Sequence, residues 1–195
     1  MNKPVRIAIY GAGNFANQTH IPNLKQIEGV DIVALCDVNE NALQDTATRF
    51  DIERTYMDAH TMLASETIDA LYSIVPAYVR TDVEISAALK GIHLFSEKPQ
   101  ALDMALARRI GEAVQKGGVI STVGFRERYR PIFQEAKRLL KDKRVVHVRF
   151  QQIAPYPEQI AQNRSSTPCR SRTSPSDACS LPISAEVGSR VNAIR

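Results

Sequence analysis

The sequence lacks the features that mark membrane, secreted and disulfide-stabilised proteins. Its 195 residues contain no apolar run of the roughly 20 residues that a bilayer-spanning helix needs. The N-terminus shows no charged region followed by a long apolar region and a cleavage site, so we expect no signal peptide. The three cysteines, Cys36, Cys169 and Cys179, fit no metal or redox spacing. These absences predict a cytoplasmic protein in a reducing setting.

The chain also has a small net charge and few histidines. Of the net charge of +4, residues 161–195 carry +3, from five arginines and two acidic residues, which leaves +1 for residues 1–160. A nearly neutral body gives no argument for nucleic-acid binding. The four histidines show no spacing typical of metal ligands, so we predict no metal site. We expect His93 to be a core residue and His20 to be structural.

A regular alternation of strand and helix patterns is present instead. Apolar runs predict strands at residues 5–10, 30–37, 54–56, 68–76, 92–99 and 119–125. Helical patterns cover residues 14–29, with a break near Ile21–Pro22, and residues 39–50, 59–64, 79–90, 102–115 and 131–141. The second strand is apolar on both faces, which suits a sheet covered on both sides. The alternation predicts an α/β fold with a Rossmann-type, doubly wound parallel sheet.

The C-terminal part of the chain departs from this pattern. Residues 145–152 alternate apolar and polar, which predicts the opening strand of an α+β second domain, of which the chain holds only the start. From residue 161 on there is no Phe, Tyr or Trp, and Ser, Arg, Thr and Pro dominate. Such a segment cannot bury enough surface to offset its ordering entropy, so we expect a disordered tail. We therefore divide the chain into residues 1–125, 126–155 and 156–195.

A glycine-rich turn follows the first predicted strand. The stretch "IYGAGNFA" places Gly11, Gly13 and Ala16 in the pattern of a dinucleotide-binding turn. Gly11 permits the tight turn, Gly13 lets backbone approach a pyrophosphate, and Ala16 keeps helix and strand close. The following helix offers free N–H groups and a partial positive charge to phosphates. We therefore predict a cofactor site that includes Asn14 and Phe15 with these three residues.

An acidic residue ends the second predicted strand, 21 residues after Ala16. At that spacing the Asp37 carboxylate would accept hydrogen bonds from the adenosine ribose hydroxyls. A 2′-phosphate would meet its negative charge, so NAD is favoured over NADP, which stays possible. The alternative is a glycine turn in an ordinary α/β fold with Asp37 as a helix cap.

Glu97, Lys98 and Pro99 follow a predicted buried strand without a spacer. Ligands of open α/β sheets bind at the carboxyl ends of the strands. Glu97 could bond a second ribose there, and Lys98 could donate or accept a proton. Val75 and Pro76, at the end of another strand, belong to the same predicted cofactor site. The alternative is a solvated acid–base pair at a strand end.

Four stretches, "GAGNFANQTHIPNL", "VALCD", "ALKGIHLFSEKP" and "VGFRERYRP", occur in order over roughly residues 4–155. Together they resemble the Gfo/Idh/MocA oxidoreductases. The resemblance implies a Rossmann domain, a second domain with a large sheet, and association into homo-oligomers. It implies hydride transfer between NAD(P) and a secondary alcohol of a sugar or polyol. It also implies that Glu97 contacts the nicotinamide ribose, that Lys98 is catalytic, and that Arg128 and Tyr129 lie near cofactor or substrate.

Two departures from the family pattern leave a second interpretation open. Where the family often has Thr-Pro-Asn-x-x-His, this chain reads Val75-Pro76-Ala77-Tyr78-Val79-Arg80. The family's histidine partner of the lysine lies well into the second domain, whereas His147 is the last histidine here. The chain is therefore either a dehydrogenase or a catalytically incompetent nucleotide-binding remnant without its substrate domain. We hypothesise that the sequence after about residue 155 is truncated or frameshifted, which reading the coding DNA in its other frames would test.

Overall fold

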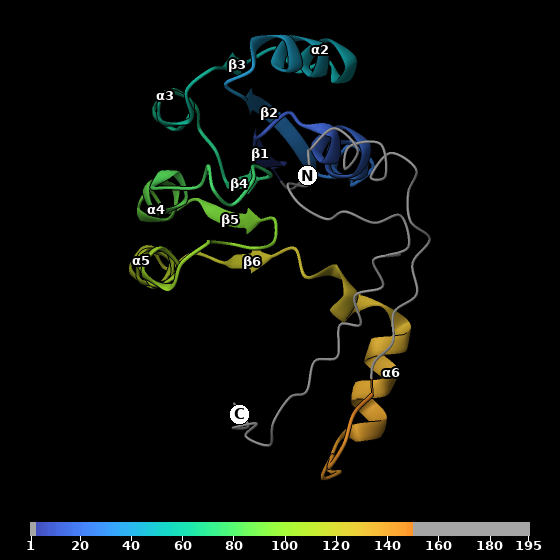
Figure 1. The fold of residues 1–195 in the computed structure, drawn as a ribbon. Helices are drawn as coiled ribbons and strands as arrows, with labels where there is room; N and C mark the ends of the chain where they lie inside the picture. Colours follow the sequence, from blue (N-terminus) through green and yellow to red (C-terminus); the bar gives the residue numbers. More distant parts are fainter. Residues whose placement is uncertain (1–2, 150–195) are drawn as a thin grey trace, which may run out of the picture. The chain divides into compact units, whose positions relative to one another are not determined.

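The computed structural model describes residues 3–149 (Figure 1). The strands are β1 (Val5–Tyr10), β2 (Val30–Cys36), β3 (Thr55–Tyr56), β4 (Ala70–Ser73), β5 (His93–Ser96) and β6 (Ser121–Val123). The helices are η1 (Ala16–His20), α1 (Ile21–Leu24), α2 (Glu40–Phe50), α3 (Ala59–Ser65), α4 (Val83–Leu89), α5 (Met104–Gly117), η2 (Arg126–Tyr129) and α6 (Pro131–Leu140). Every strand predicted before residue 126 is confirmed; β1 has the predicted bounds, and the other five are shorter than their apolar runs suggest.

The six strands form one parallel sheet in the order β3-β2-β1-β4-β5-β6. The chain starts at β1, winds outward to β3, and returns to β4 on the other side of β1. This reversal creates a topological switch point between β1 and β4, where α/β sheets bind their ligands. The predicted Rossmann-type sheet is confirmed.

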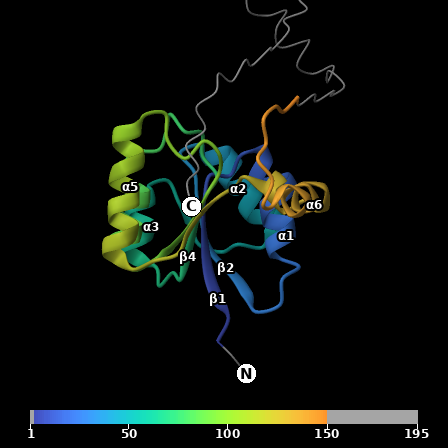
Figure 2. The same cartoon turned by 90° about the horizontal axis from the view of Figure 1, so that it is seen from below.

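Helices cover both faces of the sheet, as the apolar pattern of β2 predicts. Figure 2 shows α3 and α5 on one side of the strands, and α1 and α2 on the other. Successive residues of β1 point to opposite faces, so Ala8 packs in the core under α3, α4 and α5, while Ile9 packs under α1 and α2. Cys36 is buried in the first of these cores, where burial and the neighbouring Asp37 and Asp58 raise the pKa of its thiol to about 12.

The largest departures from the expected helices concern residues 14–29, where α1 ends at Leu24, and residues 79–90. The break expected at Ile21–Pro22 is absent, because η1 is a π-helical turn that leads directly into α1, with the Ile21 N–H donating to the Ala16 carbonyl. The wider turn places Pro22 in the first turn of α1, where a missing N–H costs little. The helix expected from residue 79 begins only at Val83, because residues 76–80 form two tight turns.

The predicted strand at 145–152 is wrong for the part that the structure describes. Residues 145–149 have no strand structure, because a strand needs a partner and residues 3–149 provide none for them. The rest of that strand and the predicted tail lie outside the described residues. The predicted helix at 131–141 is confirmed as α6, whose residues are all exposed. No helix in the described part of the chain is long and apolar enough to cross a bilayer.

Candidate cofactor site

The glycine turn at the end of β1 packs directly against the end of β4. Gly11 has φ of +108°, a conformation that side chains disfavour, and its N–H donates to the Cys36 carbonyl at 2.8 Å. A Cβ at this position would lie 3.0 Å from both the Ile74 carbonyl carbon and Val75 Cγ1. Gly11 is therefore required twice, for its backbone angle and for close packing at the switch point.

The other residues of the turn divide between core and surface. Ala16 is fully buried, which agrees with its predicted packing role. Gly13 is exposed, and a Cβ there would meet nothing within 4 Å. Asn14 and Phe15 are also exposed. The turn thus presents open backbone at the position where the sequence predicts a pyrophosphate.

Asp37 holds the glycine turn to the start of α2. Its Oδ2 accepts from the Ala12 N–H at 2.7 Å, and its Oδ1 accepts from the Asn39 N–H at 2.8 Å. The helix cap of α2 is Asn39, whose side chain accepts from the Ala42 N–H. Asp37 is therefore not the residue that caps α2, and it lies next to the turn that it was predicted to serve.

The strand ends of β4 and β5 carry the second half of the predicted site. Val75 is buried against Gly11, and Pro76 is exposed. The Glu97 carboxylate lies beside His20, with Oε1 2.9 Å from Nε2, and Oε2 accepts from the Lys98 N–H at 3.1 Å. A Cβ at Gly124 would lie 2.7 Å from Glu97 Oε1, so that glycine leaves room for the carboxylate. Two hydrogen bonds therefore orient the Glu97 carboxylate, and Gly124 lies close beside it.

Sequence reasoning assigned His20 only a structural role and missed its contact with Glu97. The His20 ring packs between aromatic rings, with centroid distances of 5.0 Å to Phe15 and 5.1 Å to Phe95. Tyr72 stacks on Phe95 at 4.7 Å. Because η1 brings His20 to the carboxyl ends of β4 and β5, a residue 77 positions away from Glu97 reaches it. His93 is exposed rather than in the core, and its Nδ1 accepts from the Ile120 N–H.

Lys98, Arg128 and Tyr129 are exposed. Within residues 3–149 the Lys98 ammonium makes no hydrogen bond or ion pair. Arg128 and Tyr129 lie on η2, which follows β6, and over the same range neither is hydrogen-bonded to Glu97, Lys98 or Pro99. The structure therefore brings the predicted cofactor residues to one edge of the sheet, and within residues 3–149 no hydrogen bond joins Arg128 or Tyr129 to Glu97 or Lys98.

Arg80 and Glu84 are functional candidates that the sequence did not indicate. Both are almost fully buried at the strand ends, where Arg80 Nε lies 3.6 Å from Glu84 Oε1. Glu84 also accepts from Ser73 Oγ at 2.5 Å. Burial lowers the pKa of the Arg80 guanidinium, while the charge of Glu84 acts in the opposite direction. The only sequence signal was that Arg80 stands where the resembled family often has histidine.

Comparison with known proteins assigns residues 5–125 to a family model described as an oxidoreductase family with an NAD-binding Rossmann fold, Gfo/Idh/MocA. D-apiose dehydrogenase of Paraburkholderia graminis is 36% identical over 137 residues, which are 69% of this chain and 36% of that protein. The scyllo-inositol 2-dehydrogenase (NAD(+)) of Bacillus subtilis is 32% identical over 139 residues, 71% of this chain and 40% of that protein.

A solved structure gives the same result. The scyllo-inositol dehydrogenase of Lactobacillus casei, crystallised with NAD(H) and scyllo-inositol, superposes with a TM-score of 0.66 at 25% identity. The match covers 72% of this chain and 42% of that one. The chain thus spans about two fifths of the length of the relatives that it matches.

Proposed function

The chain belongs to the Gfo/Idh/MocA family of oxidoreductases, and we propose that it binds NAD and presents Lys98 for hydride transfer with a secondary alcohol of a sugar or polyol. One observation carries this proposal. The glycine turn, Asp37 and the Glu97–Lys98 pair all lie at the carboxyl-end edge of one parallel sheet, on both sides of its switch point. The named relatives act on sugars and inositols, which supports the class of substrate.

The residues at this edge fit a dinucleotide in shape and charge. The exposed backbone at Gly13, which no side chain fills, leaves room for a pyrophosphate. Asp37 would accept from the adenosine ribose, and Glu97, already oriented by His20, from the nicotinamide ribose. The cofactor, when bound, supplies the hydride acceptor. Lys98 Nζ, exposed and unpaired within residues 3–149, would hold or pass the proton of the substrate hydroxyl.

The same proposal includes the predicted division of the chain. Residues 1–125 would form the cofactor domain, and residues 126–155 would begin a substrate and dimerisation domain. Arg128 and Tyr129 are exposed on η2 at this boundary. They would then contact a substrate between the two domains.

A second candidate function is nucleotide binding without turnover. It is favoured by the surroundings of Lys98, since no titratable side chain within residues 3–149 is hydrogen-bonded to its ammonium. A general acid–base residue works best when a partner relays its proton. We therefore expect NAD binding to be measurable in this chain and turnover to be low.

Replacing Asp37 by alanine is expected to weaken NAD binding roughly 10- to 100-fold, because charged hydrogen bonds to the ribose are lost. The preference for NAD over NADP should shrink, since the carboxylate no longer repels a 2′-phosphate. Isothermal titration calorimetry with both nucleotides measures the two effects. The matched control is Asp31→Ala, an exposed acid near the other end of β2. Equal NAD affinities of wild type and Asp37→Ala would contradict the assignment.

Replacing Lys98 by methionine is expected to reduce hydride transfer by roughly 10²–10⁴-fold, the usual contribution of a general acid–base residue. NAD affinity should stay within about threefold, because the exposed ammonium makes no contact that holds the site together. Formation of reduced nicotinamide with a panel of inositols and sugars measures the rate. Lys116→Met, at an exposed lysine in the last turn of α5, is the control. The proposed role of Lys98 is wrong if its variant matches this control.

A further inference from the structure

We infer that Arg80 is a positioning residue, which holds the backbone of the Glu97–Lys98–Pro99 turn and thereby sets where Lys98 stands. The inference rests on the proposed function, because it concerns the residues that would meet the nicotinamide end of the cofactor. Arg80 is a buried cation, and neither the glycine turn nor the Glu97–Lys98 pair explains its presence there.

The Arg80 guanidinium donates to four backbone carbonyls at two strand ends. Nη1 donates to the carbonyl of Glu97 and, at 2.6 Å, to that of Pro99. Nη2 donates to the carbonyl of Val75 at 2.7 Å and to that of Ser73 at 3.4 Å. Its four Nη hydrogens thus account for the four acceptors. One side chain ties the end of β4 to the turn after β5.

The position of Lys98 follows from these contacts. Its two neighbours in sequence, Glu97 and Pro99, each have a carbonyl anchored by the same guanidinium. The Lys98 side chain itself is exposed and makes no hydrogen bond within residues 3–149. Its placement therefore depends on its backbone, and Arg80 is the side chain that fixes that backbone.

The buried setting of Arg80 favours positioning over a contribution to stability. Its side chain is 1% exposed and its partner Glu84 is 0% exposed, so both charges have lost their water. Buried ion pairs of this kind add little net stability, because desolvation offsets their attraction, and they are best known for fixing one geometry. Arginine suits the task because its planar fork offers four Nη hydrogens in fixed directions to the four carbonyls, whereas the ammonium of lysine has only three hydrogens on one nitrogen.

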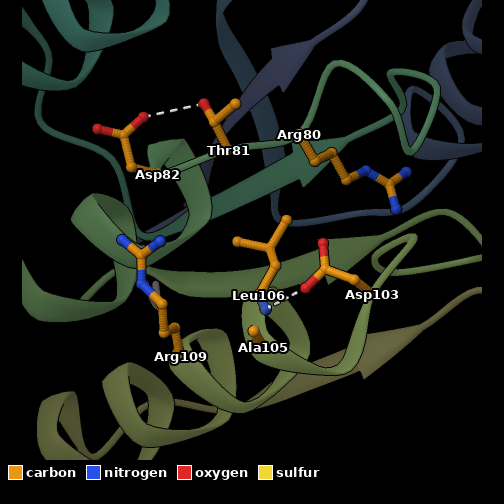
Figure 3. Close-up of a pocket in the computed structure, with 7 residues that line it drawn as sticks. All are labelled: Arg80, Thr81, Asp82, Asp103, Ala105, Leu106 and Arg109. Atoms are coloured by element: carbon orange, nitrogen blue, oxygen red, sulfur yellow. Dashed lines mark hydrogen bonds between the residues drawn. The ribbon is translucent and has the colours of Figure 1, made fainter.

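A neighbouring arginine, Arg109, offers a control for Arg80 (Figure 3). Arg80 and Arg109 line the same hollow, together with residues 81, 82, 103, 105 and 106. The Arg80 side chain runs away from Thr81 and Asp82. Arg109 is exposed on α5 and makes no hydrogen bond or ion pair within residues 3–149. Its replacement removes a nearby guanidinium without touching the strand ends.

The test compares Arg80→Lys with Arg109→Lys in the full chain, by calorimetry with NAD and by amide hydrogen exchange. Arg80→Lys keeps the charge, and we expect NAD affinity to fall about tenfold because the turn is displaced. Exchange should accelerate at the amides of residues 97, 98 and 100, since Pro99 has no amide hydrogen, and stay unchanged in β1. Arg109→Lys should match the wild type in both measurements. A merely structural role would accelerate exchange throughout the sheet.

A measurement on the wild type covers the case in which Arg80→Lys does not fold. Nitrogen-15 spectra of the arginine side chains should show four separate Nη–H signals for Arg80, because each hydrogen has its own acceptor. Averaged Nη–H signals would overturn the inference. The inference would also be overturned if Arg80→Lys and the wild type both bind NAD, with equal affinity and with equal exchange rates in this turn. Absence of NAD binding in the wild type would instead refute the proposed function, while the exchange rates at residues 97, 98 and 100 still decide whether Arg80 holds the turn.

Discussion

Replacing Gly11 by alanine should lower the free energy of unfolding by about 2–4 kcal/mol and remove NAD binding, because strain and overpacking act at one position. The φ of +108° is open to glycine and costly for alanine. The new Cβ would also lie 3.0 Å from the Ile74 carbonyl carbon, which is backbone and cannot rotate away. Urea unfolding and calorimetry with NAD measure the two losses.

Gly13→Ala is the matched control, since it adds the same methyl group two residues further along the turn. A Cβ there meets nothing within 4 Å, so stability should change by less than about 0.5 kcal/mol. NAD affinity should still fall about tenfold or more, because the methyl group occupies the approach of the pyrophosphate. An equally destabilised Gly13→Ala, or a Gly11→Ala that binds NAD normally, would contradict this division of roles.

The conformation of the proposed phosphate-binding turn could be predicted from the sequence because its determinants are local. The spacing of Gly11, Gly13 and Ala16 acts within one strand–turn–helix unit, and Asp37 ends the next strand. The apolar pattern of β2 likewise predicted a sheet covered on both faces, since burial on both faces removes alternation. These features depend on neighbours in sequence. In the structure, apolar residues pack on both faces of the sheet, and Asp37 accepts from the Ala12 N–H of the turn.

The proposed nicotinamide half of the site depends on contacts between distant segments, which sequence pattern does not reveal. His20 reaches Glu97 only because a π-helical turn and the strand order bring η1 to the end of β5. Arg80 was noticed only as a departure from a family pattern. Its four carbonyl acceptors come from two strands, and no spacing rule describes them. Residues that act through backbone in this way become visible only in three dimensions.

Beyond residue 125 the sequence patterns predicted local structure better than packing. The amphipathic pattern of residues 131–141 predicted α6 correctly, since helix formation there depends on nearby residues. Its apolar residues Ile132, Leu139 and Leu140 are nevertheless exposed, because no element in the described part of the chain covers them. The alternation at residues 145–152 has the same requirement for a partner. The period of an apolar pattern indicates which face of a helix or strand can be buried. Burial itself also needs a second element that packs against this face.

Replacing Glu84 by leucine should lower the free energy of unfolding by about 3–5 kcal/mol, because it leaves the buried Arg80 guanidinium without its counter-charge. Adding Arg80→Met should recover roughly 1–3 kcal/mol of this loss, since an apolar pair can replace a buried ion pair, although the four backbone carbonyls then lose the guanidinium as a donor.

The double variant separates the two roles of this pair. Its stability, from urea unfolding, should rise above that of Glu84→Leu, while its NAD affinity should stay about tenfold below wild type because the turn at Lys98 remains unheld. Recovery of both stability and NAD affinity would show that the ion pair serves packing alone. A stable Glu84→Leu single variant would show that Arg80 needs no counter-charge, and that its four carbonyl contacts suffice to hold it in the interior.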